Sequence, residues 1–137
     1  KIGDCDEFGI YLTAAIEKSL ASGTMKADQN VQNPRFFTVT WMEKSGKADG
    51  HNVCLLERPQ PNGPVKYSYM DYQLPSEPPL DTPDQVAVLI ASKYAGWSGL
   101  GHGKVESGVL CWCATKTNMT PVKTGLGVGW TRGVNQT

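Results

Sequence analysis

The strongest constraint on the fold is a helical repeat near the start of the chain. Residues 4–22 carry an apolar side chain every fourth position, which predicts one face of an amphipathic helix: Phe8, Leu12, Ile16 and Leu20. Asp4 is a suitable N-cap, and Glu7 three positions later completes a pattern like a capping box. Gly23 is suited to the position after the last helical residue. The helix must bury its apolar face, and we expect it to pack on a sheet.

The rest of the chain predicts short strands and a second helix. Runs rich in β-branched and aromatic residues predict strands at 36–42, 51–57, 65–72, 108–115 and 122–130. Thr82-Pro83-Asp84 predicts the start of the second helix, with Thr82 as N-cap, and Gly96 predicts its end. The apolar stripe of this helix contains Val86, Leu89, Ile90 and Tyr94. Segments rich in glycine, proline or polar residues predict loops at 24–34, 44–50, 58–64 and 73–81. The expected fold class is α+β, with an antiparallel sheet.

Length and composition limit the possible classes of protein. The 137 residues fit one domain, 1–137, in which 1–76 would hold the catalytic elements and 77–137 would complete the sheet. Thirteen basic residues balance thirteen acidic ones, so nucleic acid is not an expected partner. No apolar run approaches the roughly 20 residues of a membrane-spanning helix. Because the sequence begins with Lys1, we expect a processed chain or an excised domain, and the compartment stays open between secreted, periplasmic and others.

The cysteines do not form a recognisable metal motif. The chain has four, namely Cys5, Cys54, Cys111 and Cys113, and no two are spaced as Cys-x-x-Cys. A zinc site is therefore not predicted, and no cofactor is. Three of them, Cys54, Cys111 and Cys113, are interpreted as packing residues. A disulfide from Cys54 to one of the other two stays open for an exported protein.

Cys5 is the candidate nucleophile. It lies in the first turn of the first helix, where unpaired N–H groups and the positive end of the helix dipole stabilise a thiolate. The acidic neighbours Asp4, Asp6 and Glu7 oppose this effect. A nearby imidazolium would therefore be needed, and the helical spacing turns Cys5 toward the sheet with Phe8.

His51 is the candidate base for this thiol. It begins a predicted strand directly after Gly50, and imidazole is the side chain best suited to accept and return a proton near neutral pH. The other histidine, His102, lies in a glycine-rich loop far from a matching carboxylate strand, and it ranks behind His51.

Asp71 is the candidate residue that orients the imidazole. If 51–57 and 65–72 form a hairpin with Glu57 opposite Val65, then His51 lies directly opposite Asp71 and both point to one face. A tight turn at Asn62-Gly63 would shift the register by an odd number and separate the two side chains. The prolines of the connection favour the longer loop. Cys54 would lie on the face opposite His51.

These residues resemble a known family. Gly3-Asp4-Cys5-Asp6-Glu7-Phe8 at a helix start resembles the nucleophile motif of the transglutaminase-like cysteine peptidases. Gly50-His51 and Tyr69-Met70-Asp71 resemble the histidine and aspartate strands of that family, in the same order. The resemblance covers 3–72, and it implies a papain-like core and thiol chemistry at amide bonds. From Pro78 onward no element of the family can be aligned.

The resemblance implies a Cys-His-Asp triad acting on a protein or peptide substrate through a thioester, with peptidase as first choice. A deamidase or a transglutaminase differs in the acceptor and not in the triad, so both stay open. Only four residues precede Cys5, so a family donor to the oxyanion from upstream is missing or comes from elsewhere. The Cys5 N–H can supply half of the oxyanion hole. A non-catalytic secreted binding module with disulfide-bonded cysteines and an inactive peptide-binding descendant are the alternatives.

Overall fold

The computed structural model describes residues 5–23, 30–43, 48–71, 78–95, 105–118 and 120–126. Within these residues the chain forms two helices and five strands, in the order α1 (Cys5–Ser22), β1 (Gln32–Glu43), β2 (Ala48–Gln60), β3 (Gly63–Met70), α2 (Pro83–Ala95), β4 (Val105–Thr115) and β5 (Pro121–Leu126). The fold class is α+β, as expected.

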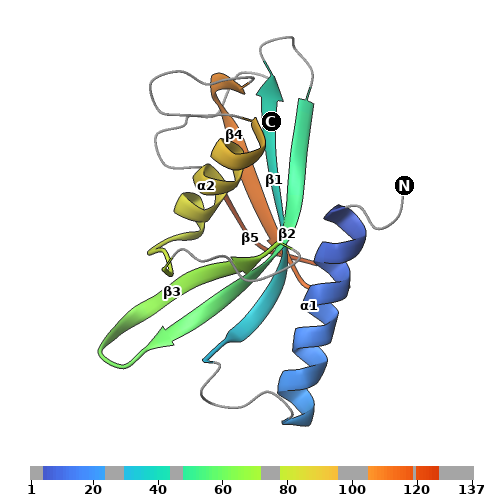
Figure 1. Ribbon diagram of the computed structural model, residues 1–137, viewed down its shortest axis with the longest axis vertical. Helices are drawn as coiled ribbons and strands as arrows, with labels where there is room; N and C mark the ends of the chain where they lie inside the picture. The colour runs from blue at the N-terminus through green and yellow to red at the C-terminus, as the bar shows by residue number, and fades with distance from the viewer. Residues whose placement is uncertain are drawn as a thin grey trace.

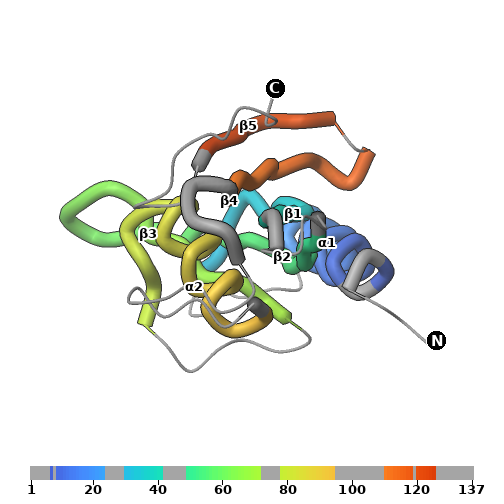
Figure 2. The backbone as a smooth tube through the Cα atoms, turned by 90° about the horizontal axis from the view of Figure 1, so that it is seen from above, coloured from blue at the N-terminus to red at the C-terminus, as the bar shows by residue number. Residues whose placement is uncertain are grey.

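All five strands form one antiparallel sheet with the order β3-β2-β1-β4-β5. The central strand β1 pairs with β2 on one side and with β4 on the other. The strands from the second half of the chain therefore extend the sheet that the first half begins. Figure 1 shows α1 and α2 to either side of the central strands, and Figure 2 shows the same separation from above.

The two helices cover opposite faces of the sheet. The core under α2 joins Val86 and Ile90 to alternate strand residues, among them Val53 and Leu55 of β2. A second core, under α1, contains Ile16 and the intervening β2 residues: Cys54 and Leu56. Because side chains alternate along a strand, these two sets point to different faces. The sheet is thus the middle layer between the helices.

Two of the predicted helix boundaries, the end of α1 and the start of α2, are confirmed by their caps. Gly23 follows α1 with a φ of 74°, a conformation that costs glycine little, and its N–H donates to the Leu20 carbonyl at 3.3 Å. Thr82 caps α2, because its Oγ1 accepts a hydrogen bond from the Gln85 N–H at 3.2 Å. The predicted cap Asp4 and the predicted end of the second helix, Gly96, lie outside the described residues.

The strands are longer than expected at several ends. The expected loop at 24–34 is wrong for its last residues, because β1 begins at Gln32. An irregularity in the pairing with β2 between Gln32 and Arg35 accommodates Pro34, which has no N–H for the ladder, and Asn33, whose φ is 47°. The predicted strand at 122–130 is described only to Leu126, as β5.

Gly9 lets α1 lie close to the sheet. A Cβ at this position would be 2.8 Å from the Phe36 ring and 3.6 Å from the Cβ of Asn52. The early turns of α1 therefore lie beside Asn52, the residue that follows His51 in β2. Cys5 lies one helical turn before Gly9, and residues four apart share a helix face.

Candidate active site

His51 and Asp71 form a direct hydrogen bond. His51 Nε2 lies 2.8 Å from Asp71 Oδ1, and the two side chains are 8% and 15% exposed. His51 belongs to β2, and Asp71 directly follows β3. Two residues that are 20 positions apart are thus brought together in a largely buried position, as the sequence analysis expected of this pair.

The pairing register differs from the predicted one. The structure pairs Leu55 with Tyr69, whereas the expected hairpin paired Val53 with Tyr69. Continuing the observed register by one pair sets Asp71 opposite Val53, so His51 is its diagonal neighbour rather than its direct partner. The shift of two residues preserves the face of every side chain. Diagonal neighbours are within reach of long and aromatic side chains, which explains why the hydrogen bond still forms.

A β-bulge makes this arrangement possible. The prediction of a longer loop is wrong, because Gln60 pairs with Gly63 and leaves only two residues, Pro61 and Asn62, in the turn. That turn alone would place His51 and Asp71 on opposite faces. The pairing register shifts by one residue between Arg58 and Gln60. This bulge offsets the shift caused by the two-residue turn, so His51 and Asp71 point to the same face of the sheet.

Tyr94 is a member of the site that the sequence analysis missed. Its ring stacks on the His51 ring with centroids 3.7 Å apart and an interplanar angle of 24°. Its hydroxyl donates a short hydrogen bond to Asp71 Oδ2. The sequence pattern places Tyr94 on the apolar stripe of α2. A phenol at the end of that stripe was the available signal, because a hydroxyl near a core usually has a polar partner.

The hydrogen bond assigns distinct roles to the two ring nitrogens of His51. An ionised carboxylate only accepts hydrogen bonds, so Nε2 carries the proton that Asp71 Oδ1 accepts. In the neutral ring the lone pair then lies on Nδ1. Asp71 therefore selects the tautomer in which Nδ1 can act as a base. Chemically, such a pair can serve as a general base with an orienting carboxylate.

Cys5 is the first residue of α1, as predicted, and the structure describes its backbone but not its side chain. The helix packs on the Cys54 face of β2, whereas His51 faces Tyr94 of α2. The start of α1 and the imidazole therefore lie on different sides of β2. The sequence predicts that Cys5 turns toward the sheet and meets the imidazole of His51, with Cys54 on the face away from the site. The structure instead places α1 on the Cys54 face, opposite His51.

Cys54 and Cys113 are free thiols. Cys54 is buried, and Cys111 and Cys113 are partly exposed. Cys54 lies on the face opposite His51, as expected, and it packs beneath α1. His102 lies outside the described residues.

Burial raises the pKa of the Cys54 thiol from 9.0 to about 11. Folding therefore retains a proton that the unfolded chain loses between these pH values, so stability falls as the pH rises from 9 to 11. We expect this residue alone to remove about 2 kcal/mol from the free energy of unfolding across that interval. Urea unfolding of wild type and Cys54→Ala at pH 8, 9, 10 and 11 measures it, because titrations shared by both proteins cancel. Parallel curves for the two proteins would contradict the prediction.

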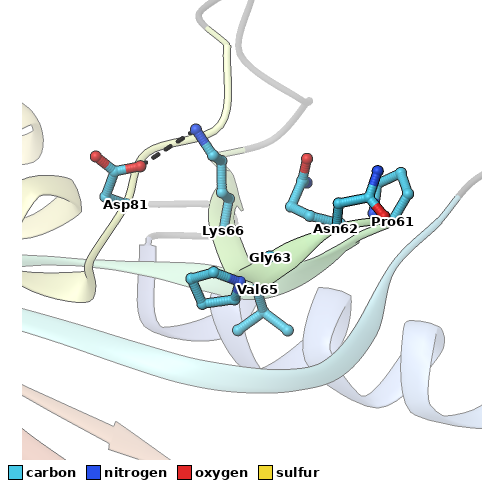
Figure 3. A pocket seen from close by; sticks show the side chains of 8 residues that line it. Pro61, Asn62, Gly63, Val65, Lys66 and Asp81 are labelled. Atoms are coloured by element: carbon cyan, nitrogen blue, oxygen red, sulfur yellow. Dashed lines mark ion pairs between the residues drawn. The ribbon is translucent and has the colours of Figure 1, made fainter.

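An open depression of about 390 Å³ lies at the β2–β3 hairpin (Figure 3), and His51 is not among the residues that line it. It is lined by the turn and by Lys66 and Asp81, which form an exposed ion pair at 3.2 Å. None of its lining residues is a predicted site residue. Among the residues that the structure describes, no group of three potential metal ligands occurs, and no helix is long and apolar enough to cross a membrane.

Searches of protein families, of curated proteins and of solved structures return no match to this chain.

Proposed function

We propose that this chain is a thiol-dependent hydrolase or acyl transferase that acts on peptide or glutamine-type amide bonds, with peptidase as the first choice. Cys5 is the nucleophile, His51 the base and Asp71 the residue that orients it. A papain-like, transglutaminase-like arrangement of these elements is part of the proposal. The observation that carries it is the 2.8 Å hydrogen bond between His51 Nε2 and Asp71 Oδ1, which leaves Nδ1 as the basic nitrogen.

The proposed reaction uses Nδ1 of His51 as a proton carrier. Nδ1 removes the proton from the Cys5 thiol, and the sulfur forms a bond with the carbonyl carbon of the substrate. The Cys5 N–H, at the first turn of α1, stabilises the oxyanion. Nδ1 then protonates the leaving amine as the carbon–nitrogen bond breaks, which leaves a thioester. Water or an acceptor amine, deprotonated by Nδ1, attacks the thioester and releases the Cys5 thiol, which regains its proton.

The thiol and the imidazole must meet at the margin of β2. The last described pair between β2 and β3 is Cys54 with Met70, so β2 at His51 lies beyond the paired part of β3. The early turns of α1 lie beside Asn52, at the same level of the strand. In the proposed site the Cys5 sulfur therefore reaches His51 Nδ1 around this edge of β2 rather than across one face of the sheet.

A disulfide-trapping experiment tests this meeting directly. The proposed triad brings the Cys5 and His51 side chains into contact, and a disulfide forms between residues whose Cα atoms lie within about 7 Å. A thiol introduced by His51→Cys should therefore oxidise to a disulfide with Cys5. The matched control is Asn52→Cys, because Asn52 faces α1. Peptide mapping by mass spectrometry identifies the bridged cysteines. Bridging of Cys5 by Asn52→Cys but not by His51→Cys would contradict the triad.

A second candidate is the non-catalytic binding module. The separation of α1 and His51 by the sheet favours it, since a purely structural Cys5 has no need to reach the imidazole. The free thiols of Cys54 and Cys113 disfavour a disulfide-bonded form of this module that uses these two residues. The trapping experiment distinguishes the two candidates.

A further inference from the structure

Two consecutive residues of α2 form hydrogen bonds with Tyr69 of β3 and with Asp71, which directly follows β3. Lys93 Nζ donates to Tyr69 Oη at 2.9 Å, and the hydroxyl of the next residue, Tyr94, donates to Asp71 Oδ2. At its first turn, α2 is fixed to β4, because Trp112 Nε1 donates to Asp84 Oδ1 at 2.6 Å. Contacts at both ends of α2 therefore fix where the Tyr94 ring lies.

We infer that Tyr94 is a positioning residue for the proposed His51 base. Asp71 has two carboxylate oxygens, and Tyr94 occupies Oδ2, so the other oxygen, Oδ1, is held toward His51 Nε2. This orientation keeps the proton on Nε2 and the lone pair on Nδ1. The inference rests on the proposed function, in which Nδ1 is the base.

The ring of Tyr94 has a separate effect from its hydroxyl. Stacked at 3.7 Å, it covers one face of the imidazole and prevents rotation of the His51 side chain toward α2. Although its ring covers His51, Tyr94 itself is 44% exposed, so its outer side faces solvent. Tyr94→Phe keeps the ring and removes only the hydroxyl, whereas Tyr94→Leu removes both.

The tautomer of His51 is the decisive measurement, because it depends on the hydroxyl and not on the presence of a substrate. The chain has two histidines, so long-range ¹H–¹⁵N spectra with His102→Gln as a reference assign the His51 nitrogens. We expect one tautomer, protonated at Nε2, in the wild type and a mixture of both in Tyr94→Phe. Lys93→Met is the matched control, because it removes the neighbouring α2 contact without touching Asp71, and it should keep the single tautomer.

Activity provides the second readout. With a substrate in hand, Tyr94→Phe should lower kcat about tenfold with little change in KM, because it alters the base and not the binding of substrate. An unchanged tautomer in Tyr94→Phe would overturn the inference. A changed tautomer in a protein whose wild type has no Cys5-dependent activity would instead overturn the proposed function, so the two failures are distinguishable. If Tyr94→Phe does not fold, Asp71→Glu, which displaces the same carboxylate, tests the orientation by the same spectra.

Discussion

Cys5→Ala is expected to abolish every reaction of this chain with an amide substrate. The proposed chemistry passes through a thioester on the Cys5 sulfur, and alanine has no atom that can form this bond. The expected loss of rate is at least about 10⁴-fold, as is usual when the nucleophile of a triad is removed. A glutamine-containing mixed peptide pool, incubated with and without an added primary amine, allows mass spectrometry to detect cleavage, deamidation and amine incorporation together.

The three products also decide the acceptor, which the triad itself does not determine. Cleavage indicates a peptidase, conversion of glutamine to glutamate a deamidase, and incorporation of the amine a transglutaminase. Cys111→Ala and Cys113→Ala are matched thiol deletions, and both should retain activity because these residues lie on β4, which carries no member of the proposed triad. Activity that survives in Cys5→Ala, or that disappears with either control, would refute Cys5 as the nucleophile.

The contact between His51 and Asp71 could be predicted from the sequence because it mainly requires that both side chains point to the same face of the sheet. The expected register is wrong by two residues, yet an even error leaves each side chain on its own face. The details of the turn were not predictable. Proline and glycine in the connection signal a turn but do not determine where it closes, and the compensating bulge near Arg58 has no clear sequence pattern.

The placement of the helices could not be predicted, for a physical reason that lies in β2. Val53, Cys54, Leu55 and Leu56 form a continuous apolar run, and all four are buried. A strand that is apolar on both faces indicates burial on both sides but does not say which helix covers which face. The same ambiguity hid Tyr94, since its contact with His51 depends on α2 covering the face to which His51 points.

Asp71→Ala is expected to reduce activity by about 10⁴-fold, the size of loss seen when the carboxylate partner of a catalytic histidine is replaced. The substitution removes the acceptor for both the His51 Nε2–H and the Tyr94 hydroxyl. Without that acceptor the imidazole is free to take the other tautomer, in which Nδ1 is protonated and cannot act as a base. Steady-state kinetics on the substrate found with the peptide pool measures the loss. A variant with near wild-type kcat would show that Asp71 does not orient the base.

Asp71→Asn separates the charge of Asp71 from its hydrogen bonds, because asparagine, unlike alanine, can keep both contacts. The amide oxygen can still accept from Nε2–H, and the amide NH₂ can donate to the Tyr94 oxygen, since a phenol both donates and accepts. Only the charge is lost, so we expect a smaller effect, about tenfold to a hundredfold. Adding Tyr94→Phe removes the partner of the NH₂ group and frees the amide to turn a donor toward Nε2. The double variant should therefore lose more activity than the product of the single losses, whereas independent effects would multiply.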